Sequence, residues 1–246
     1  MIRPPLRALT FDLDDTLWSV DDVLLAAEYR LYDYLRERYP AVAERFDPDR
    51  MRALRSALAE ANPELRRNAT TLRRAVMREA AQQSGIRDAA AVEAFTEETF
   101  AVFLEARQSG VHPYPEVPAE LPRLAQRFAI GVITNGNADV YRTELGAYVD
   151  FVVRGVDLDI PKPEPEIFAH ACRCAGARPQ EVLHVGDDPW IDAAGALAAG
   201  MQAALVCRNP PVEPFEGLPD CLVVPDLGAL RRAIESSLDE GAAEGR

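Results

Sequence analysis

The alternation of short apolar segments with helical patterns is the feature of this sequence that most restricts its fold. Strand-like segments rich in β-forming residues lie at 6–13, 128–134, 151–154, 182–185, 202–207 and 222–224. Helical patterns lie near 117–127, 138–146, 164–175, 189–199 and 226–238. Strands joined by helices form parallel sheets that are covered by helices on both faces. The sequence therefore predicts an α/β fold with a doubly wound, mainly parallel sheet.

Residues 20–110 do not follow this alternation. Strand signals are almost absent there, and apolar residues such as Leu24 and Tyr32 recur at helical spacing. Four helices are expected, separated by Pro40, Pro48, Pro63 and Gly85. Prolines at 113, 115, 118 and 122 then form a stiff connection back to the α/β pattern. We therefore expect a core domain of residues 1–18 and 113–246, with a helical domain of residues 19–112 inserted after the first strand.

Composition and charge exclude several classes of protein. A chain of 246 residues is long enough for a core of about 150 residues and a second module. Its net charge of −13 argues against nucleic acid or an anionic membrane as a partner, since both are bound through clustered basic side chains. No apolar run approaches the roughly 18 residues of a membrane span, and no signal-peptide pattern is present. We expect a cytoplasmic protein, monomeric or homodimeric, that acts on small molecules.

Polar residues stand at the ends of three of the predicted strands. Asp12 and Asp14 stand at the end of the first strand, Thr134 and Asn135 at the end of the second, and Asp187 after the fourth. Ligands of open α/β sheets bind beyond the carboxyl ends of the strands, so these side chains are expected in one pocket. Several carboxylates at close range cannot all stay ionised without a cation. An acid-rich site without thiols or imidazoles suits Mg²⁺, which prefers oxygen ligands.

Lys162 is the single lysine among 27 basic residues. It is flanked by Pro161 and Pro163, and the proline that follows holds it in an extended conformation. A compact, flexible ammonium differs in geometry from the planar guanidinium that the rest of the chain uses. We therefore predict that Lys162 enters the pocket and supplies positive charge there.

These residue types indicate phosphoryl transfer. Asp12 can attack phosphorus and form an aspartyl-phosphate, a covalent intermediate that carboxylates support. Asp14 is placed to protonate the leaving alkoxide and later to activate water. The Thr134 hydroxyl and the Asn135 amide can hold phosphate oxygens, while Mg²⁺ and Lys162 offset charge in the transition state. We therefore predict hydrolysis of a small phosphorylated metabolite.

The same residues resemble the four motifs of the haloacid dehalogenase (HAD) superfamily. These motifs are DLDDT at 12–16, ITN at 133–135, the lysine of PKP at 161–163 and GDDxxxD at 186–192, in the order and spacing of the family. The resemblance implies a Rossmann-like core, with Asp12 as nucleophile and Asp14 as general acid and base. It also implies that Asp12, the Asp14 carbonyl and Asp187 bind Mg²⁺, with Asp188 or Asp192 behind them.

The helical insertion is similar to the C1 cap of this family, which closes over the site and selects small substrates. At finer grain, LTFDLDDTLW, ITNGNA, LHVGDD and GMQA resemble bacterial phosphatases that act on flavin mononucleotide and on 5-amino-6-(5-phosphoribitylamino)uracil, a riboflavin precursor. Asn68, Thr70 and Arg73 match an N-x-T-x-x-R-like stretch in their caps, which implies that Arg73 contacts the substrate. Trp18 fits either stacking on a flavin or pyrimidine ring, or packing at a domain junction.

Other activities stay open on these residues. Phosphatases of sugar phosphates or nucleotides in the same superfamily would carry the same core motifs. A 2-haloacid dehalogenase would keep the nucleophile but would need neither a metal nor an acid at Asp14, so Asp14 and Asp187 argue against it. A phospho-aspartate signalling domain would carry its phosphorylated residue on the third strand. A purely binding or structural role would leave these carboxylates as inactive remnants.

Overall fold

A six-stranded, fully parallel sheet forms the centre of the α/β part of the chain, in the order β3-β2-β1-β4-β5-β6. The computed structural model describes residues 2–208, 217–218 and 220–244, and side chains as far as residue 239. The strands are β1 (Ala8–Phe11), β2 (Ala129–Thr134), β3 (Phe151–Arg154), β4 (Val182–Gly186), β5 (Gln202–Val206) and β6 (Leu222–Val224). The predicted α/β class with a parallel sheet is confirmed, and β1 is shorter than the expected 6–13.

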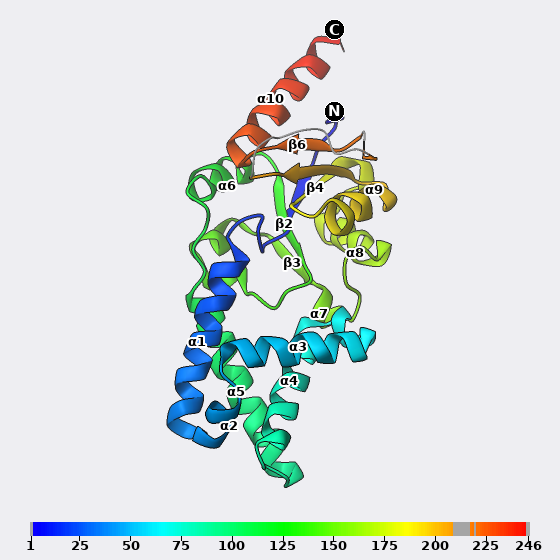
Figure 1. The fold of residues 1–246 in the computed structure, drawn as a ribbon. Coiled ribbons are helices and arrows are strands. Elements are labelled where there is room, and N and C mark those ends of the chain that lie inside the picture. Colours follow the sequence, from blue (N-terminus) through cyan, green and yellow to red (C-terminus); the bar gives the residue numbers. More distant parts are fainter. Residues whose placement is uncertain (1, 209–216, 219, 245–246) are drawn as a thin grey trace. The chain divides into compact units, whose positions relative to one another are not determined.

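Helices cover both faces of this sheet, which explains why its central strands are apolar throughout. The helices here are α6 (Val117–Ala125), α7 (Gly155–Leu158), α8 (Pro165–Ala175), α9 (Gly195–Ala198) and α10 (Leu227–Glu244). Figure 1 shows α8 and α9 on one side of the sheet and α6 and α10 on the other. Every residue of β1 and β4 is buried, because a central parallel strand meets helices above and below.

Two predicted helices have a different form in the structure. The helix expected at 138–146 is wrong: two short 3-10 helices, η2 (Val140–Arg142) and η3 (Glu144–Tyr148), replace it. Thr143 separates them in an extended conformation, and its hydroxyl accepts a hydrogen bond from the Leu145 amide at 3.3 Å. Short polar side chains that bond to nearby backbone compete with a continuous helix in this way. The stretch 189–199 begins as a π-helix, η5 (Pro189–Ala194), before α9.

The remaining helices form a second compact unit of residues 20–111 and 136–138, while residues 1–19, 112–135 and 139–246 form the first. Its elements are α1 (Val20–Arg38), α2 (Pro40–Arg45), α3 (Pro48–Ala61), η1 (Pro63–Arg67), α4 (Ala69–Gln83) and α5 (Ala89–Ser109). There are five α-helices in this described range rather than the four expected, because Pro40 begins a short helix of its own. Positions 1, 209–216, 219, 245 and 246 of the predicted core domain lie outside the described residues. The cap role expected for the helical unit stays a prediction.

Side-chain caps and one apolar core hold the helical unit together. Asp47, Asn68 and Asp88 accept hydrogen bonds from the first free amides of α3, α4 and α5, at 2.8 to 3.0 Å. α5 lies beside α1 and α4, and Val76, Phe95 and Phe103 are almost fully buried between the helices. Among the described residues, none of the helices has both the length and the apolar character needed to cross a bilayer.

Candidate active site

The sheet topology brings the ends of β1 and β4 together at the point where the strand order reverses. β1 pairs with β2 on one side and with β4 on the other, so Phe11 lies opposite both Val132 and Val185. The Asp12 amide continues this pairing, donating to the Val185 carbonyl at 2.9 Å. Ligands of doubly wound sheets bind at such a reversal, beyond the carboxyl ends of the strands. Asp12 and Asp187 therefore stand at the position where a ligand site is expected.

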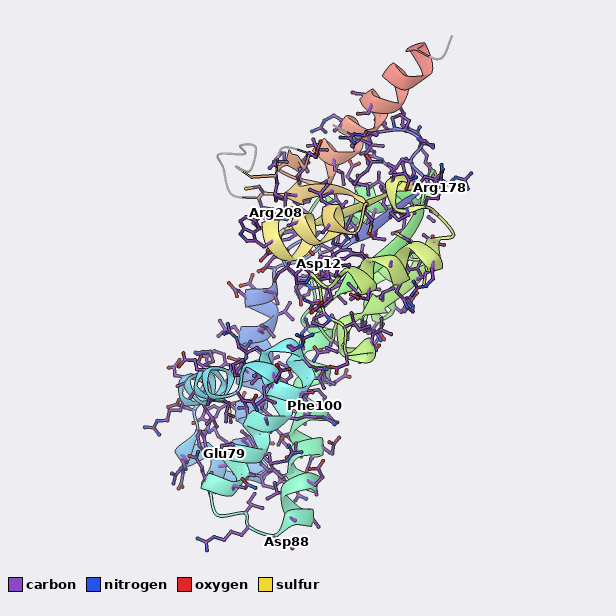
Figure 2. All side chains as sticks on the ribbon, turned by 90° about the vertical axis from the view of Figure 1, so that its right-hand side faces the viewer. Asp12, Glu79, Asp88, Phe100, Arg178 and Arg208 are labelled. Carbon is purple, nitrogen blue, oxygen red and sulfur yellow. The ribbon has the colours of Figure 1, made fainter. Side chains whose placement is uncertain are left out.

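Three carboxylates meet at this edge of the sheet. Asp12, Asp187 and Asp192 each offer one oxygen, and these oxygens all lie within 4.8 Å of one another. Asp12 and Asp192 are buried, with 7% and 2% of their surface exposed, whereas Asp187 is partly exposed. Figure 2 marks Asp12 within the α/β unit. Buried carboxylates at this separation repel one another strongly, so the cluster requires positive charge.

Lys162 provides part of that charge. Its Nζ donates to Asp12 Oδ1 and to Asp192 Oδ1, both at 2.5 Å, and only 4% of the residue is exposed. The Asn135 side chain holds the Lys162 backbone on both sides: Oδ1 accepts from the Lys162 amide at 2.6 Å, and Nδ2 donates to its carbonyl at 2.9 Å. The side chain of Asn135, a residue predicted to contact phosphate, therefore orients Lys162, and the phosphate contact stays a prediction.

His184 lies behind the cluster and completes a chain of polar contacts. Its Nε2 lies 3.2 Å from Asp192 Oδ1, and its Nδ1 lies 3.0 Å from the Thr10 hydroxyl. An ionised carboxylate can only accept, so we assign the ring proton to Nε2 and let Nδ1 accept from Thr10. Burial lowers the pKa of His184, which keeps the ring neutral. In these contacts both ring nitrogens of His184 are engaged by Thr10 and Asp192, so His184 orients Asp192.

Burial and crowding shift the pKa values of the acids in different directions. Burial raises the pKa of Asp12, and the carboxylates of Asp192 and Asp14 add to this, while Lys162 opposes it. Burial also raises the pKa of Asp187, to about 6, with help from Asp192 and Asp15. For Asp192, Lys162 and His184 outweigh burial and lower the pKa. The ammonium of Lys162 thus outweighs burial at Asp192 but not at Asp12.

The polar side chains of the loop after β1 each bond to a different partner. Asp14 Oδ1 accepts a hydrogen bond from Trp18 Nε1 at 2.8 Å, and the Thr16 hydroxyl donates to Asp187 Oδ1 at 3.2 Å. Trp18 has none of its surface exposed, which favours the packing interpretation over stacking on a ligand ring. Thr16, although part of the DxDxT motif, and the indole N–H thus have roles in the structure that the sequence pattern does not predict.

Arg208 anchors the same loop from β5's carboxyl end. Its Nη2 donates to the Thr16 carbonyl at 2.7 Å, and its guanidinium stacks on the Tyr114 ring at 3.5 Å from the centroid. Its Nη1 bonds to Glu116 at 2.7 Å, while the Tyr114 amide donates to the Leu17 carbonyl at 2.9 Å. Residues far apart in the sequence therefore fix the loop that carries Asp14 and Thr16.

The two candidate acids after Asp187 separate clearly in the structure. Asp188 caps η5, accepting from the amides of Trp190 and Ile191 at 2.7 and 2.8 Å. Asp192 instead points to Lys162 and His184 and also accepts from the Asp188 amide, at 3.1 Å. Of the two positions predicted to lie behind the metal ligands, Asp192 is the one that joins the carboxylate cluster.

Thr134 and Arg73 have different surroundings. Thr134 ends β2 with 1% of its surface exposed. Arg73 lies on α4 inside the helical unit, 6% exposed, with Nη1 3.4 Å from Glu28 Oε1 and its guanidinium 4.1 Å from the Phe103 ring centroid. Burial lowers the pKa of Arg73 to about 10. This arrangement supports a structural role for Arg73, and the substrate contact predicted for it stays untested.

Substitution of Gly186 by Ala is expected to displace Asp192. A Cβ at Gly186 would lie 2.2 Å from Asp192 Cγ, a separation that heavy atoms do not adopt, so the carboxylate must leave Lys162. We expect a loss of about 1–3 kcal/mol in the free energy of unfolding and a fall in kcat, measured by urea unfolding and steady-state kinetics. Gly131→Ala is the matched control, since its Cβ would lie 2.2 Å from Phe151 Cζ, in the same sheet. A similar fall in kcat for both variants would contradict the prediction.

Comparisons with known proteins agree with this geometry. A model of the haloacid dehalogenase-like hydrolase family matches residues 6–200. The chain belongs to this family. The resemblance predicted from the four motifs and the assignment as a hydrolase are therefore confirmed, and the matched range spans the helical unit and the α/β unit as far as α9.

Individual relatives of this HAD-family chain include phosphatases and a dehalogenase. The 5-amino-6-(5-phospho-D-ribitylamino)uracil phosphatase YigB of Escherichia coli is 32% identical over 202 residues, 82% of this chain and 83% of that protein. A phosphoserine phosphatase of Thermus thermophilus is 35% identical over 61% of each chain. Among solved structures, a 2-haloacid dehalogenase from Pseudomonas syringae is 36% identical, with a TM-score of 0.84 over 94% of this chain and 99% of that one. Because the family includes both phosphatases and dehalogenases, the reaction of this chain has to be inferred from its site residues.

Proposed function

We propose that this protein is a magnesium-dependent phosphatase that hydrolyses a small phosphorylated metabolite through an aspartyl-phosphate on Asp12. The observation that carries the proposal is the 2.5 Å contact between Lys162 Nζ and Asp12 Oδ1, beside the carboxylates of Asp187 and Asp192. A dianionic phosphoryl group can approach a carboxylate nucleophile only where cations offset both charges. Phosphatases among the relatives support the same reaction class.

The residues at the sheet edge fit Mg²⁺ by their chemistry. All the candidate donors are oxygens, and burial together with the carboxylates of Asp192 and Asp15 raises the pKa of Asp187 to about 6, so a cation would stabilise its ionised form. We propose Asp12, Asp187 and the Asp14 carbonyl as ligands. Asp192 is already bonded to Lys162 and His184, so we assign it to holding Lys162 behind the ligands. When bound, Mg²⁺ would offset negative charge on the phosphoryl oxygens and on the acids.

The chain's own residues then account for the two halves of the reaction. In the first, an Asp12 carboxylate oxygen bonds to phosphorus, the ester P–O bond breaks, and Asp14 gives its proton to the leaving oxygen. In the second, Asp14 takes a proton from water as that water attacks phosphorus and breaks the bond to Asp12. Inorganic phosphate leaves, and both carboxylates return to their starting states.

Positioning in both halves falls to Lys162 and Thr134. Lys162 is held by its backbone through Asn135 and by its ammonium through Asp192, so its charge stays beside Asp12. We propose that it contacts a phosphoryl oxygen during transfer, together with the Thr134 hydroxyl and the Asn135 main chain. Since Asn135 uses its side chain on Lys162, its contribution to substrate through that side chain is indirect.

The first experiment measures hydrolysis of p-nitrophenyl phosphate by the purified protein with Mg²⁺ and with EDTA. We expect turnover that needs the metal. The absence of turnover under both conditions would refute the proposed function and favour a binding role.

For the physiological substrate we propose a riboflavin-pathway phosphate, either flavin mononucleotide or the phosphoribitylamino-uracil that names the Escherichia coli relative. Sugar phosphates and nucleotides are the alternative, because the core residues serve any phosphate monoester. A panel of these compounds, compared by kcat/KM, separates the two. A preference for sugar phosphates or nucleotides over both riboflavin-pathway compounds would reject the substrate assignment while leaving the reaction class intact.

A 2-haloacid dehalogenase is the second candidate, because a relative solved at 36% identity carries that name. Halide leaves without a proton, so dehalogenation gives Asp14 no task as an acid and needs no metal cluster. We therefore expect no halide release from 2-chloropropionate under conditions where phosphate esters turn over. Halide release comparable to phosphate release would reverse this order.

The stability conferred by Mg²⁺ is expected to depend on pH. The pKa of Asp187 is about 6 in the folded protein, above the value of about 3.9 for an unfolded chain. Without metal, its contribution to stability is present below pH 4 and is lost as the pH rises through 6, because the folded state must release a proton it binds more tightly. Mg²⁺ binds the ionised form, so its stabilising effect should grow over the same range.

Thermal unfolding in Mg²⁺ and in EDTA, at pH 5 and at pH 7, tests this expectation. The increase in Tm on adding Mg²⁺ should be larger at pH 7. Asp187→Asn should abolish most of the increase at both pH values. Equal increases in the wild type at pH 5 and pH 7 would contradict the prediction.

Location and assembly stay proposals. We propose a cytoplasmic protein that is a monomer or a homodimer, and that the helical unit covers bound substrate as a cap. Cell fractionation and light scattering test the first two, and protection of the helical unit from proteolysis by substrate tests the third.

A further inference from the structure

The one polar side-chain atom of Trp18, Nε1, lies beside the carboxyl group of Asp14. The Nε1–H donates to Asp14 Oδ1 at 2.8 Å, while the indole has no exposed surface. A buried indole N–H without an acceptor would be costly, and a carboxylate is a strong acceptor. Asp14 is only partly buried, so its carboxyl group would otherwise rotate with fewer constraints.

The backbone between the two residues is arranged to allow this contact. Asp15 adopts a left-handed conformation with φ of 59°, which Asp tolerates better than most residues. Its amide donates to the Trp18 carbonyl at 2.7 Å, and Asp14 and Trp18 form a backbone bridge. Trp18 also bridges to Pro113, at the start of the segment that Arg208 anchors through Tyr114. The turn therefore fixes the donor relative to the acceptor through several independent bonds.

Neighbouring side chains of this turn reach different acids. The Thr16 hydroxyl donates to Asp187, whereas the Trp18 indole donates to Asp14. Lys162 contacts Asp12 and Asp192 but not Asp14 in these bonds. The indole N–H of Trp18 therefore donates to the acid that, in the proposed mechanism, moves protons.

We infer that Trp18 is a positioning residue that holds the Asp14 carboxyl group in the orientation needed for proton transfer to the leaving oxygen. The inference rests on the proposed phosphatase function. In the first half of the reaction the Asp12–phosphorus bond forms, the ester P–O bond breaks and the Asp14 proton moves to the ester oxygen. Proton transfer requires the acid within hydrogen-bond reach of that oxygen, so loss of orientation lowers the rate.

The test compares two esters that differ in their need for a proton. The leaving group of an alkyl phosphate such as glycerol phosphate is an alkoxide, which needs a proton. The leaving group of p-nitrophenyl phosphate is p-nitrophenolate, which is stable as an anion. The value of kcat/KM reports the steps up to release of the alcohol. For Trp18→Phe we expect kcat/KM to fall about tenfold with the alkyl ester, within the range for a lost hydrogen bond between neutral groups, because Asp14 carries its proton in this step; with the aryl ester we expect a fall of less than about twofold.

A double-variant comparison separates positioning from packing. If Trp18 acts through Asp14, adding Trp18→Phe to Asp14→Asn should cost nothing further in kcat/KM with the alkyl ester. A packing role would lower it by the same factor in both backgrounds. Trp190→Phe is the matched control, since Trp190 is the other tryptophan and is 60% exposed; it should keep the ratio of the two kcat/KM values.

If Trp18→Phe does not fold, benzothienylalanine at position 18 replaces it, because this residue keeps the ring shape and removes only the N–H. An equal fall with both esters, or no fall with the alkyl ester, overturns the inference and leaves the phosphatase proposal standing. A wild type that hydrolyses neither ester overturns both.

Discussion

Replacement of Asp12 by Asn is expected to lower kcat for phosphate esters by about 10⁴-fold or more, the scale seen when an enzyme loses its nucleophile. The amide has the volume of the carboxylate but cannot attack phosphorus. The amide Nδ2 or Oδ1 would still lie beside Lys162, so the pocket should keep its shape. Turnover comparable to that of the wild type would remove Asp12 from the mechanism.

The same variant should be at least as stable as the wild type when no metal is present. Burial and two neighbouring carboxylates raise the pKa of Asp12, so the ionised group destabilises the folded state of the metal-free protein. Asn removes this charge while Lys162 keeps Asp192 as its partner. Thermal unfolding in EDTA is the measurement, and a clear decrease in Tm would show that the charge is needed for folding.

Asp88→Asn is the matched control for Asp12→Asn. Asp88 makes the N-terminal cap of α5 and accepts from the Ala91 amide at 2.9 Å (Figure 2). Asn caps helices about as well as Asp, so neither kcat nor Tm should change appreciably. Loss of activity in both variants would point to a general effect of removing negative charge.

Replacement of Lys162 by Met is expected to have the largest effect on stability. The variant leaves Asp12 and Asp192 buried without their shared ammonium, and breaking a buried ion pair costs about 3–5 kcal/mol. Urea unfolding at pH 7 in EDTA measures this loss. Adding Asp192→Asn to Lys162→Met should recover much of the lost stability, because one unpaired carboxylate is removed. Phosphatase activity should not return, because the ammonium beside Asp12 is still missing.

Lys162→Arg tests the geometry of the cation rather than its charge. The two 2.5 Å contacts converge on one nitrogen, which a planar guanidinium cannot reproduce in the same space. We expect kcat to fall by about 100-fold while the protein remains folded. Wild-type kinetics would show that the single lysine of the chain has no special task.

Arg178→Met is the control for both Lys162 variants. Arg178 pairs with Glu181 at 2.9 Å (Figure 2), and its own side chain is 66% exposed. Glu181, whose side chain is 7% exposed, would keep the hydrogen bond from the Arg178 amide at 2.9 Å and the guanidinium of Arg7 at 3.8 Å. Little change in stability and none in kcat is expected. A loss similar to that of Lys162→Met would mean that removal of any cation from this acidic chain destabilises it.

The main features of the fold were predictable because they depend on local periodicity. The apolar segments at 151–154 and 222–224 coincide with β3 and β6, and the polar residues that follow the first and fourth strands lie at one edge of the sheet. Parallel strands that are buried on both faces align their apolar segments. The polar residues that follow these segments therefore lie at the same edge of the sheet. The helix expected at 138–146 was wrong because Thr143 bonds to its own backbone neighbours.

The details of the site depended on contacts between distant residues. The motif left Asp188 and Asp192 as alternatives, and the structure separates them: Asp188 accepts from two η5 amides, whereas Asp192 contacts Lys162 and His184. Asn135 is predicted to contact substrate, and that prediction is untested; only the structure shows that its side chain also holds the Lys162 backbone, 27 residues away. The contact of Arg73 with substrate stays a prediction, and only the structure shows that Glu28 and Phe103 lie beside its guanidinium.

Sequence alone was sufficient for the fold class and the family, and it indicated that Asp12, Asp187 and Lys162 would lie together, since residue types and their spacing along strands carry that information. The partner of each side chain was decided only in three dimensions. A carboxylate or an indole N–H bonds to whichever group the folded chain brings within 3 Å. That neighbour comes from packing across the sheet and from the turn between Asp12 and Trp18, which no pattern in the sequence records.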